Sequence, residues 1–181
     1  MKNSKRYFVG IDLPKDVKDE LKYIESAMLG AKWTKSDQYH LTIRFIGELD
    51  TELIEKLCEQ LEKVEAERVP LTVEGVGQFP PKGEPKILWA GVEKDEALLN
   101  LKQVIEEQVN SIGFEKDKRN YTPHITLARL RRPRVRDIKE FVNVHSSLEL
   151  PRYEVDSFHL YSSEMTEEGP VYKVEKSFRL K

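Results

Sequence analysis

One short pattern, His-x-Thr between apolar residues, occurs at two distant places in the chain. The segment YHLTIRFIG contains His40 and Thr42, and the segment YTPHITLARL contains His124 and Thr126. In both segments polar and apolar residues alternate, which is typical of a β-strand with one buried face. Because side chains alternate across a strand, each His-Thr pair should face away from the core together. The pattern predicts two equivalent strands, each presenting one pair.

The two motifs occupy matching places in a repeated order of elements. Each half of the chain is expected to run strand, helix, His-x-Thr strand, helix, strand, with the Pro- and Gly-rich stretch 77–86 between the halves. This order favours an α+β fold of two pseudo-symmetric lobes around a central cleft, each lobe a mainly antiparallel sheet with outer helices. We expect residues 1–181 to form a single bilobal domain.

Composition and charge indicate the cellular compartment in which the protein works. The formal net charge is -2, so any affinity for nucleic acid must come from a local patch. Cys58 is the single cysteine, which excludes an internal disulfide and fits a reducing compartment. The apolar run near the N-terminus is broken by Asp12 and Pro14 and is too short to span a membrane. These features predict a soluble, cytoplasmic protein, which we expect to be a monomer.

Two histidines that face each other across a cleft are suited to general acid–base catalysis near neutral pH. The hydroxyls of Thr42 and Thr126 can donate hydrogen bonds to phosphate oxygens that gain charge in the transition state. Together the four side chains indicate a phosphodiester substrate attacked by water. The near-symmetry of the motifs leaves open which histidine is the acid. No His or Cys spacing is typical of a metal site, so we expect neither metal nor cofactor.

The chain resembles the 2H phosphoesterases, specifically the RNA 2′,3′-cyclic phosphodiesterases once described as 2′-5′ RNA ligases. The resemblance is carried by RYFVGIDLP, WTKSDQYHLTIRFIGEL, QFPPKGEPKILWAGV, TPHITLARL and FHLYSSEMTEEGPVYKV. It implies a bilobal fold with a central cleft and metal-independent hydrolysis of RNA ends that bear a 2′,3′-cyclic phosphate. The implied product is a 2′-phosphomonoester. The resemblance also implies that His40 is the proton donor and His124 the proton acceptor.

Three further residues are candidates for binding the substrate. On a straight strand Arg44 shares the face of His40, where it would either reach a phosphate or be an ordinary exposed charge. The resemblance suggests a phosphate contact for Arg129, although alternation places it opposite His124 unless a bulge turns it. Phe45, just after the first motif, is our candidate for stacking a base.

The segment RLRRPRVR, residues 129–136, contains five arginines. It would either hold RNA phosphates or form a solvated turn before a helix.

The sequence leaves two other activities open. An RNA- or nucleotide-binding module could keep the cleft without turnover, and a 2′-5′ RNA ligase could use the reverse chemistry, with a ribose hydroxyl in place of water.

Overall fold

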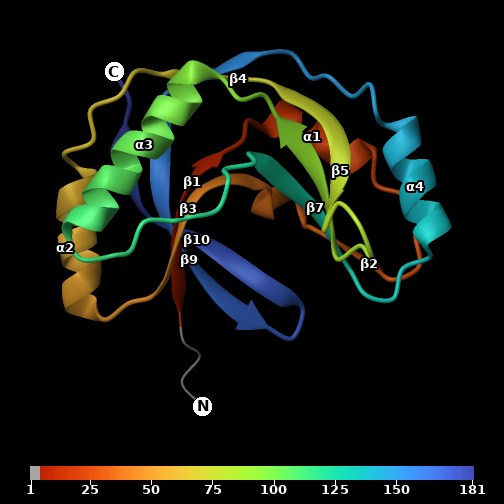
Figure 1. Cartoon of the computed structure of the whole chain (residues 1–181), viewed down its shortest axis with the longest axis horizontal. Coiled ribbons are helices and arrows are strands. Elements are labelled where there is room, and N and C mark those ends of the chain that lie inside the picture. The colour runs from red at the N-terminus through yellow and green to blue at the C-terminus, as the bar shows by residue number, and fades with distance from the viewer. Residues whose placement is uncertain (1–4) are drawn as a thin grey trace.

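Two four-stranded antiparallel sheets form the framework of the protein, which a computed structural model describes over residues 5–181 (Figure 1). The first sheet has the order β10-β9-β1-β3, and the second has the order β2-β7-β6-β5. The strands of the first sheet are β1 (Arg6–Asp12), β3 (His40–Glu48), β9 (Ser157–Thr166) and β10 (Gly169–Arg179). Those of the second are β2 (Ala31–Trp33), β5 (Val73–Phe79), β6 (Ile87–Val92) and β7 (His124–Leu130). A short pair, β4 (Val69–Leu71) and β8 (Tyr153–Val155), forms a third sheet.

The two halves of the sequence exchange their closing strands. β5 closes the first half yet pairs with β6 of the second half. β9 belongs to the second half yet pairs with β1 of the first. The short strand β2, from the first half, pairs with β7. The predicted α+β fold with antiparallel sheets is therefore confirmed, and each of the two large sheets contains strands from both halves of the sequence.

The helices lie on the outer sides of the two sheets (Figure 1). They are α1 (Lys15–Tyr23), α2 (Thr51–Leu61), α3 (Glu96–Ser111) and α4 (Val135–Val144), with a 3₁₀ turn, η1 (Ser36–Gln38), before β3. Asp50 and Asp95 begin α2 and α3, because each carboxylate accepts a hydrogen bond from a backbone N–H of the first turn. α2 and α3 contact each other beside the first sheet, and α4 lies at the opposite side of the molecule (Figure 1). Over residues 5–181, no helix is long and apolar enough to cross a membrane.

One continuous core runs beneath both motifs. Leu41 and Ile43 of β3 and Ile125 and Leu127 of β7 are buried in it, each at most 2% exposed. The motif histidines and threonines between them are only partly buried. The alternation predicted from the sequence is therefore confirmed where it matters most, at the start of the two strands.

Candidate active site

Both motifs reach a single cavity between the two sheets. β3 and β7 contact each other in the middle of the molecule. The cavity, about 200 Å³ in volume, is lined by His40 from β3 and by Thr126 and Arg129 from β7. Tyr172 of β10 and Lys32 of β2 also line it. Residues that are far apart in the sequence therefore meet at one place.

Each motif histidine is oriented by the carbonyl oxygen of the residue two places before it. Nδ1 of His40 lies 2.9 Å from the carbonyl oxygen of Gln38, and Nδ1 of His124 lies 2.6 Å from that of Thr122. Because a carbonyl oxygen only accepts hydrogen bonds, we infer that Nδ1 carries the proton in both rings. In the neutral form each Nε2 is then an acceptor, and that of His40 accepts from the Thr42 hydroxyl at 3.1 Å.

Burial lowers the pKa of His40 to about 4, because the charged imidazolium loses its contact with water. The ring centroids of Phe8 and Tyr172 lie 4.8 and 4.7 Å from that of His40. The hydrogen bond to the Gln38 carbonyl partly opposes this effect, and the charge of His124 adds to it. Burial also lowers the pKa of His124. In the unliganded protein both rings are therefore biased toward the neutral form.

A β-bulge in β3 changes which face its later residues occupy. The register with β1 skips Ile43, which directly follows Thr42. Arg44 is consequently only 9% exposed, whereas the next residue, Phe45, is 53% exposed. Ile43 and Arg44, which are consecutive in the sequence, thus both point into the interior. The expectation that Arg44 shares the face of His40 is wrong for this reason.

β7 has the same irregularity at the matching place. Its register with β6 skips Leu127, which directly follows Thr126. Ala128 is buried, and Arg129 is exposed and lines the cavity that also contains His40. Strict alternation would have turned Arg129 to the opposite face, so the bulge is what brings it in. Its contact with a phosphate remains a prediction.

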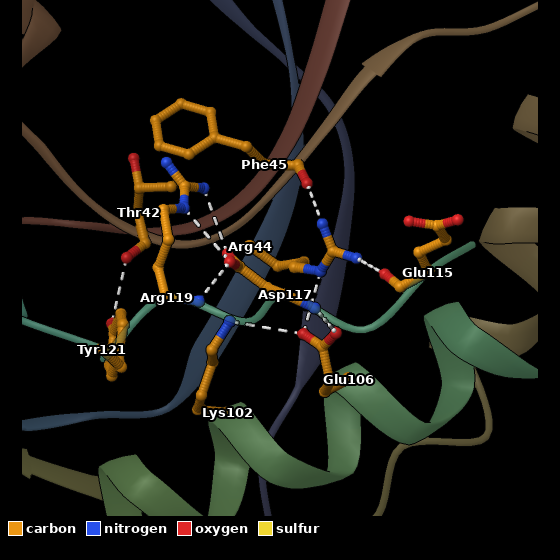
Figure 2. A network of polar contacts seen from close by, with 9 residues as sticks. All are labelled: Thr42, Arg44, Phe45, Lys102, Glu106, Glu115, Asp117, Arg119 and Tyr121. Atoms are coloured by element: carbon orange, nitrogen blue, oxygen red, sulfur yellow. Dashed lines mark hydrogen bonds and ion pairs between the residues drawn. The ribbon is translucent and has the colours of Figure 1, made fainter.

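A buried ion pair holds Arg44 on the side of β3 that faces α3 (Figure 2). Nε of Arg44 donates to Oε2 of Glu106 at 2.8 Å. The two terminal nitrogens donate to the carbonyl oxygens of Phe45 and Glu115, at 2.6 and 2.5 Å. Because these contacts occupy all three nitrogens, Arg44 is a structural residue here and does not enter the proposal for substrate binding.

The same network anchors the loop between α3 and β7 (Figure 2). Glu106 accepts a hydrogen bond from the backbone N–H of Asp117 at 2.9 Å. The Tyr121 hydroxyl donates to the carbonyl oxygen of Thr42 at 3.0 Å. This loop also contains Thr122, whose carbonyl orients His124. The loop that positions one histidine is thus fixed to the strand that carries the other.

The aromatic side chains near the motifs differ in exposure. Phe8 is buried beside His40, and the Tyr121 hydroxyl donates to β3, whereas Phe45 is exposed. Cys58 is partly buried, and burial raises the pKa of its thiol. Within residues 5–181, no group of three or more His, Cys, Asp or Glu residues is arranged to hold a metal ion.

Sequence reasoning missed three residues that shape the site. Gln38 and Thr122 both lie two places before a motif histidine, and this shared spacing was the signal that could have revealed them. Tyr172 comes from the far end of the chain, and its backbone N–H donates to the side chain of Gln38 at 2.7 Å. No local pattern marks it.

The chain is similar to known proteins in sequence and in overall structure. The family model described as LigT like Phosphoesterase matches residues 11–89 and 91–172. The protein named RNA 2′,3′-cyclic phosphodiesterase of Archaeoglobus fulgidus is 33% identical over 173 residues, covering 93% of this chain and 96% of that protein. The Thermotoga maritima protein of the same name is 31% identical, covering 93% and 92%. The crystal structure of TT0787 of Thermus thermophilus superposes with a TM-score of 0.80 at 28% identity, covering 96% and 97%.

Proposed function

Because the chain belongs to the LigT-like phosphoesterase family, we propose that it hydrolyses the terminal 2′,3′-cyclic phosphate of RNA to a 2′-phosphomonoester. The observation that carries the proposal is the equal orientation of the two histidines, each with Nδ1 bound to a carbonyl, which leaves Nε2 as the nitrogen that exchanges a proton. The shared name of the relatives, RNA 2′,3′-cyclic phosphodiesterase, supports the choice of substrate.

The reaction needs one proton removed and one supplied. Neutral His124 takes a proton from water on Nε2 as the water oxygen forms a bond to phosphorus. Protonated His40 donates its Nε2 proton to the 3′ oxygen as the P–O3′ bond breaks. In-line attack requires the two groups on opposite sides of phosphorus, which suits residues from two facing strands. The products are a 2′-phosphomonoester and a free 3′-hydroxyl.

Thr42 couples the charge on His40 to the phosphate. In the neutral state the Thr42 hydroxyl donates to Nε2 of His40, so its proton is occupied. Once His40 is protonated, Nε2 carries the proton that is donated to the 3′ oxygen and can no longer accept from Thr42. The hydroxyl proton is then released to bind a nonbridging phosphate oxygen. Thr126, in the matching place, supplies a second hydroxyl.

His40 can act as the proton donor only if its lowered pKa rises when the substrate binds. With a pKa of about 4 in the unliganded protein, His40 is neutral near pH 7 and cannot act as the acid. A bound phosphodiester brings a negative charge next to the ring, which favours the imidazolium and raises its pKa. Binding of the anionic substrate is therefore expected to take up a proton at His40.

The test is incubation with a short RNA that ends in a 2′,3′-cyclic phosphate, followed by identification of the product. The proposal predicts a 2′-phosphate. A 3′-phosphate would mean that the substrate binds in the opposite orientation, with its 2′ oxygen beside His40. No hydrolysis by the wild-type protein would refute the proposed activity.

A further inference from the structure

Five arginines gather where β7 passes into α4. They lie within residues 129–136, which we call the arginine turn, and the segment contains no acidic residue. All five side chains are exposed. They are Arg129, Arg131, Arg132, Arg134 and Arg136. On a chain with a formal net charge of -2, the turn is a local region of concentrated positive charge.

The charges of the arginine turn are not neutralised from within the fold. Some exposed arginines elsewhere are paired, as Arg68 is with Glu154 and Arg152 with Asp95, at 3.0 and 3.2 Å. Over residues 5–181, none of the ion pairs involves an arginine of the turn. Like charges held this close repel one another, so an anionic partner would lower the energy of the segment.

The backbone of the turn is held in place before any partner arrives. The N–H of Arg131 donates to the carbonyl oxygen of Gly30 at 2.8 Å. Gly30 has a φ of +81°, and a β-carbon there would collide with the carbonyl of Arg131. Arg132 has a φ of 47°, a left-handed conformation that non-glycine residues seldom adopt. Such a conformation persists where the surrounding structure imposes it, and it is common at binding sites.

The arginine turn is continuous with the active-site cavity. Arg129 lies directly opposite Lys32 in the pairing of β7 with β2, and both line the cavity that contains His40. Arg131 follows two residues later, ~6.6 Å further along an extended chain. Exposed positive charge therefore continues along the chain from the cavity lining past the end of β7.

We propose that the arginine turn binds the phosphodiester backbone of the RNA on the 5′ side of the terminal nucleotide. The inference rests on the proposed function, which places the terminal phosphate between His40 and His124. The rest of an RNA strand must then leave the cavity, and the arginine turn supplies guanidinium groups along one exit. Guanidinium groups bind phosphates through paired hydrogen bonds, and a backbone offers anions at regular intervals. The enzyme thereby favours polynucleotide ends over free cyclic mononucleotides.

The test compares two double variants that remove the same charge. Arg131→Gln/Arg134→Gln alters the turn, and Lys63→Gln/Lys94→Gln, beside the ends of the distant helices α2 and α3, is the control. For each we would measure kcat/KM on a short single-stranded RNA with a 2′,3′-cyclic phosphate and on a 2′,3′-cyclic mononucleotide. Measurements between about 50 and 200 mM salt separate electrostatic contacts from other effects.

We expect the arginine variant to lose roughly tenfold in kcat/KM on the oligonucleotide at low salt. Its logarithmic salt slope should fall by about 1.4, because each phosphate that is no longer bound lowers the slope by about 0.7. Activity on the mononucleotide should stay unchanged, and the control variant should match wild type on both substrates. An equal loss on both substrates, or no loss on the oligonucleotide, overturns the proposal. Weaker binding to anionic vesicles without any loss on RNA also overturns it, in favour of a membrane partner.

A separate binding measurement distinguishes failure of this inference from failure of the proposed activity. If wild type hydrolyses neither substrate, the activity is refuted, but fluorescence anisotropy with a hydroxyl-ended oligoribonucleotide still tests the arginine turn. If only the arginine variant binds more weakly than wild type, the arginine turn is supported as an RNA-binding surface. Equal binding by wild type and both variants overturns it.

Discussion

Phe45 and Arg129 occupy equivalent positions, each five residues after its motif histidine and each exposed by a bulge that follows the motif threonine. The two strands share their geometry but differ in the chemistry they present there. An aromatic ring stacks on a base, whereas a guanidinium group binds a phosphate. This difference breaks the near-symmetry of the two strands, and we expect it to give a substrate one preferred direction across the site.

Replacing Phe45 with alanine is expected to weaken substrate binding. Stacking of one base on an aromatic side chain contributes ~1–3 kcal/mol, so KM should rise roughly tenfold or more. The side chain is 53% exposed, so the free energy of unfolding should change little. Phe45→Trp, which keeps an aromatic face, serves as the control. A KM for Phe45→Ala equal to that of wild type would remove the stacking role.

Replacing either motif histidine should abolish most turnover, and the leaving group should separate the two roles. His40→Ala and His124→Ala are each expected to lower kcat by roughly 10²-fold or more, the usual scale for a positioned acid or base. A substrate with a nitrophenolate leaving group needs no proton donor, so it should restore activity to His40→Ala far more than to His124→Ala. His145→Ala, at the end of α4, is the control. Equal restoration of both variants contradicts the assigned roles.

We expect kcat to depend on the hydroxyl group of Thr42 more than on the volume of its side chain. Thr42→Val keeps the volume but removes the donor, and loss of one donor to a transition-state oxygen typically lowers kcat by ~10²-fold. Thr42→Ser keeps the hydroxyl and should retain most of the activity. Steady-state kinetics of the two variants checks this. Comparable kcat values for the valine and serine variants would show that the hydroxyl does not act on the phosphate.

The buried imidazole of His40 should make stability depend on pH. Its pKa is about 4 in the folded protein and ~6.5 when unfolded, so between these values the unfolded chain binds more protons. The free energy of unfolding is therefore expected to fall as the pH drops from 6.5 toward 4. Urea unfolding of wild type and His40→Gln across this range should show a shallower dependence for the variant. NMR titration of His40 with a midpoint near 6.5 would contradict the premise.

The ion pair between Arg44 and Glu106 should be essential for stability. Glu106→Gln leaves the guanidinium buried without its counter-charge, which typically costs about 3 kcal/mol or more in the free energy of unfolding. Glu107→Gln changes the same charge on the exposed side of α3 and should alter stability by less than ~0.5 kcal/mol. Urea denaturation measures both. A Glu106→Gln variant as stable as Glu107→Gln would mean that the pair contributes little.

The orientation of the motif residues could be predicted from the sequence because it depends on a local rule. Alternation from Leu41 to Ile43 and from Ile125 to Leu127 fixes the facing of the residues between them. Beyond each threonine the rule fails, since a bulge depends on how the strand pairs with its neighbour. For that reason alternation alone places Arg44 on the wrong face.

The exchange of strands could not be predicted, because it depends on contacts between distant segments. The stretch PLTVEGVGQF reads as one strand, yet it contains the end of β4 and all of β5, which belong to different sheets. Nothing in its local pattern separates the two. The partner of β5 is decided by packing across the whole chain, which a propensity for strand does not encode.

The exchanged strands impose an order on folding during synthesis. The second sheet has all its strands once the chain has been made as far as Leu130, the last residue of β7. β1 is synthesised long before its partner β9, which begins only at Ser157. Until β9 is made, one edge of β1 therefore has no strand to pair with, and open edges attract other chains. A nascent chain stalled before β9 is therefore expected to aggregate more readily than the complete fold.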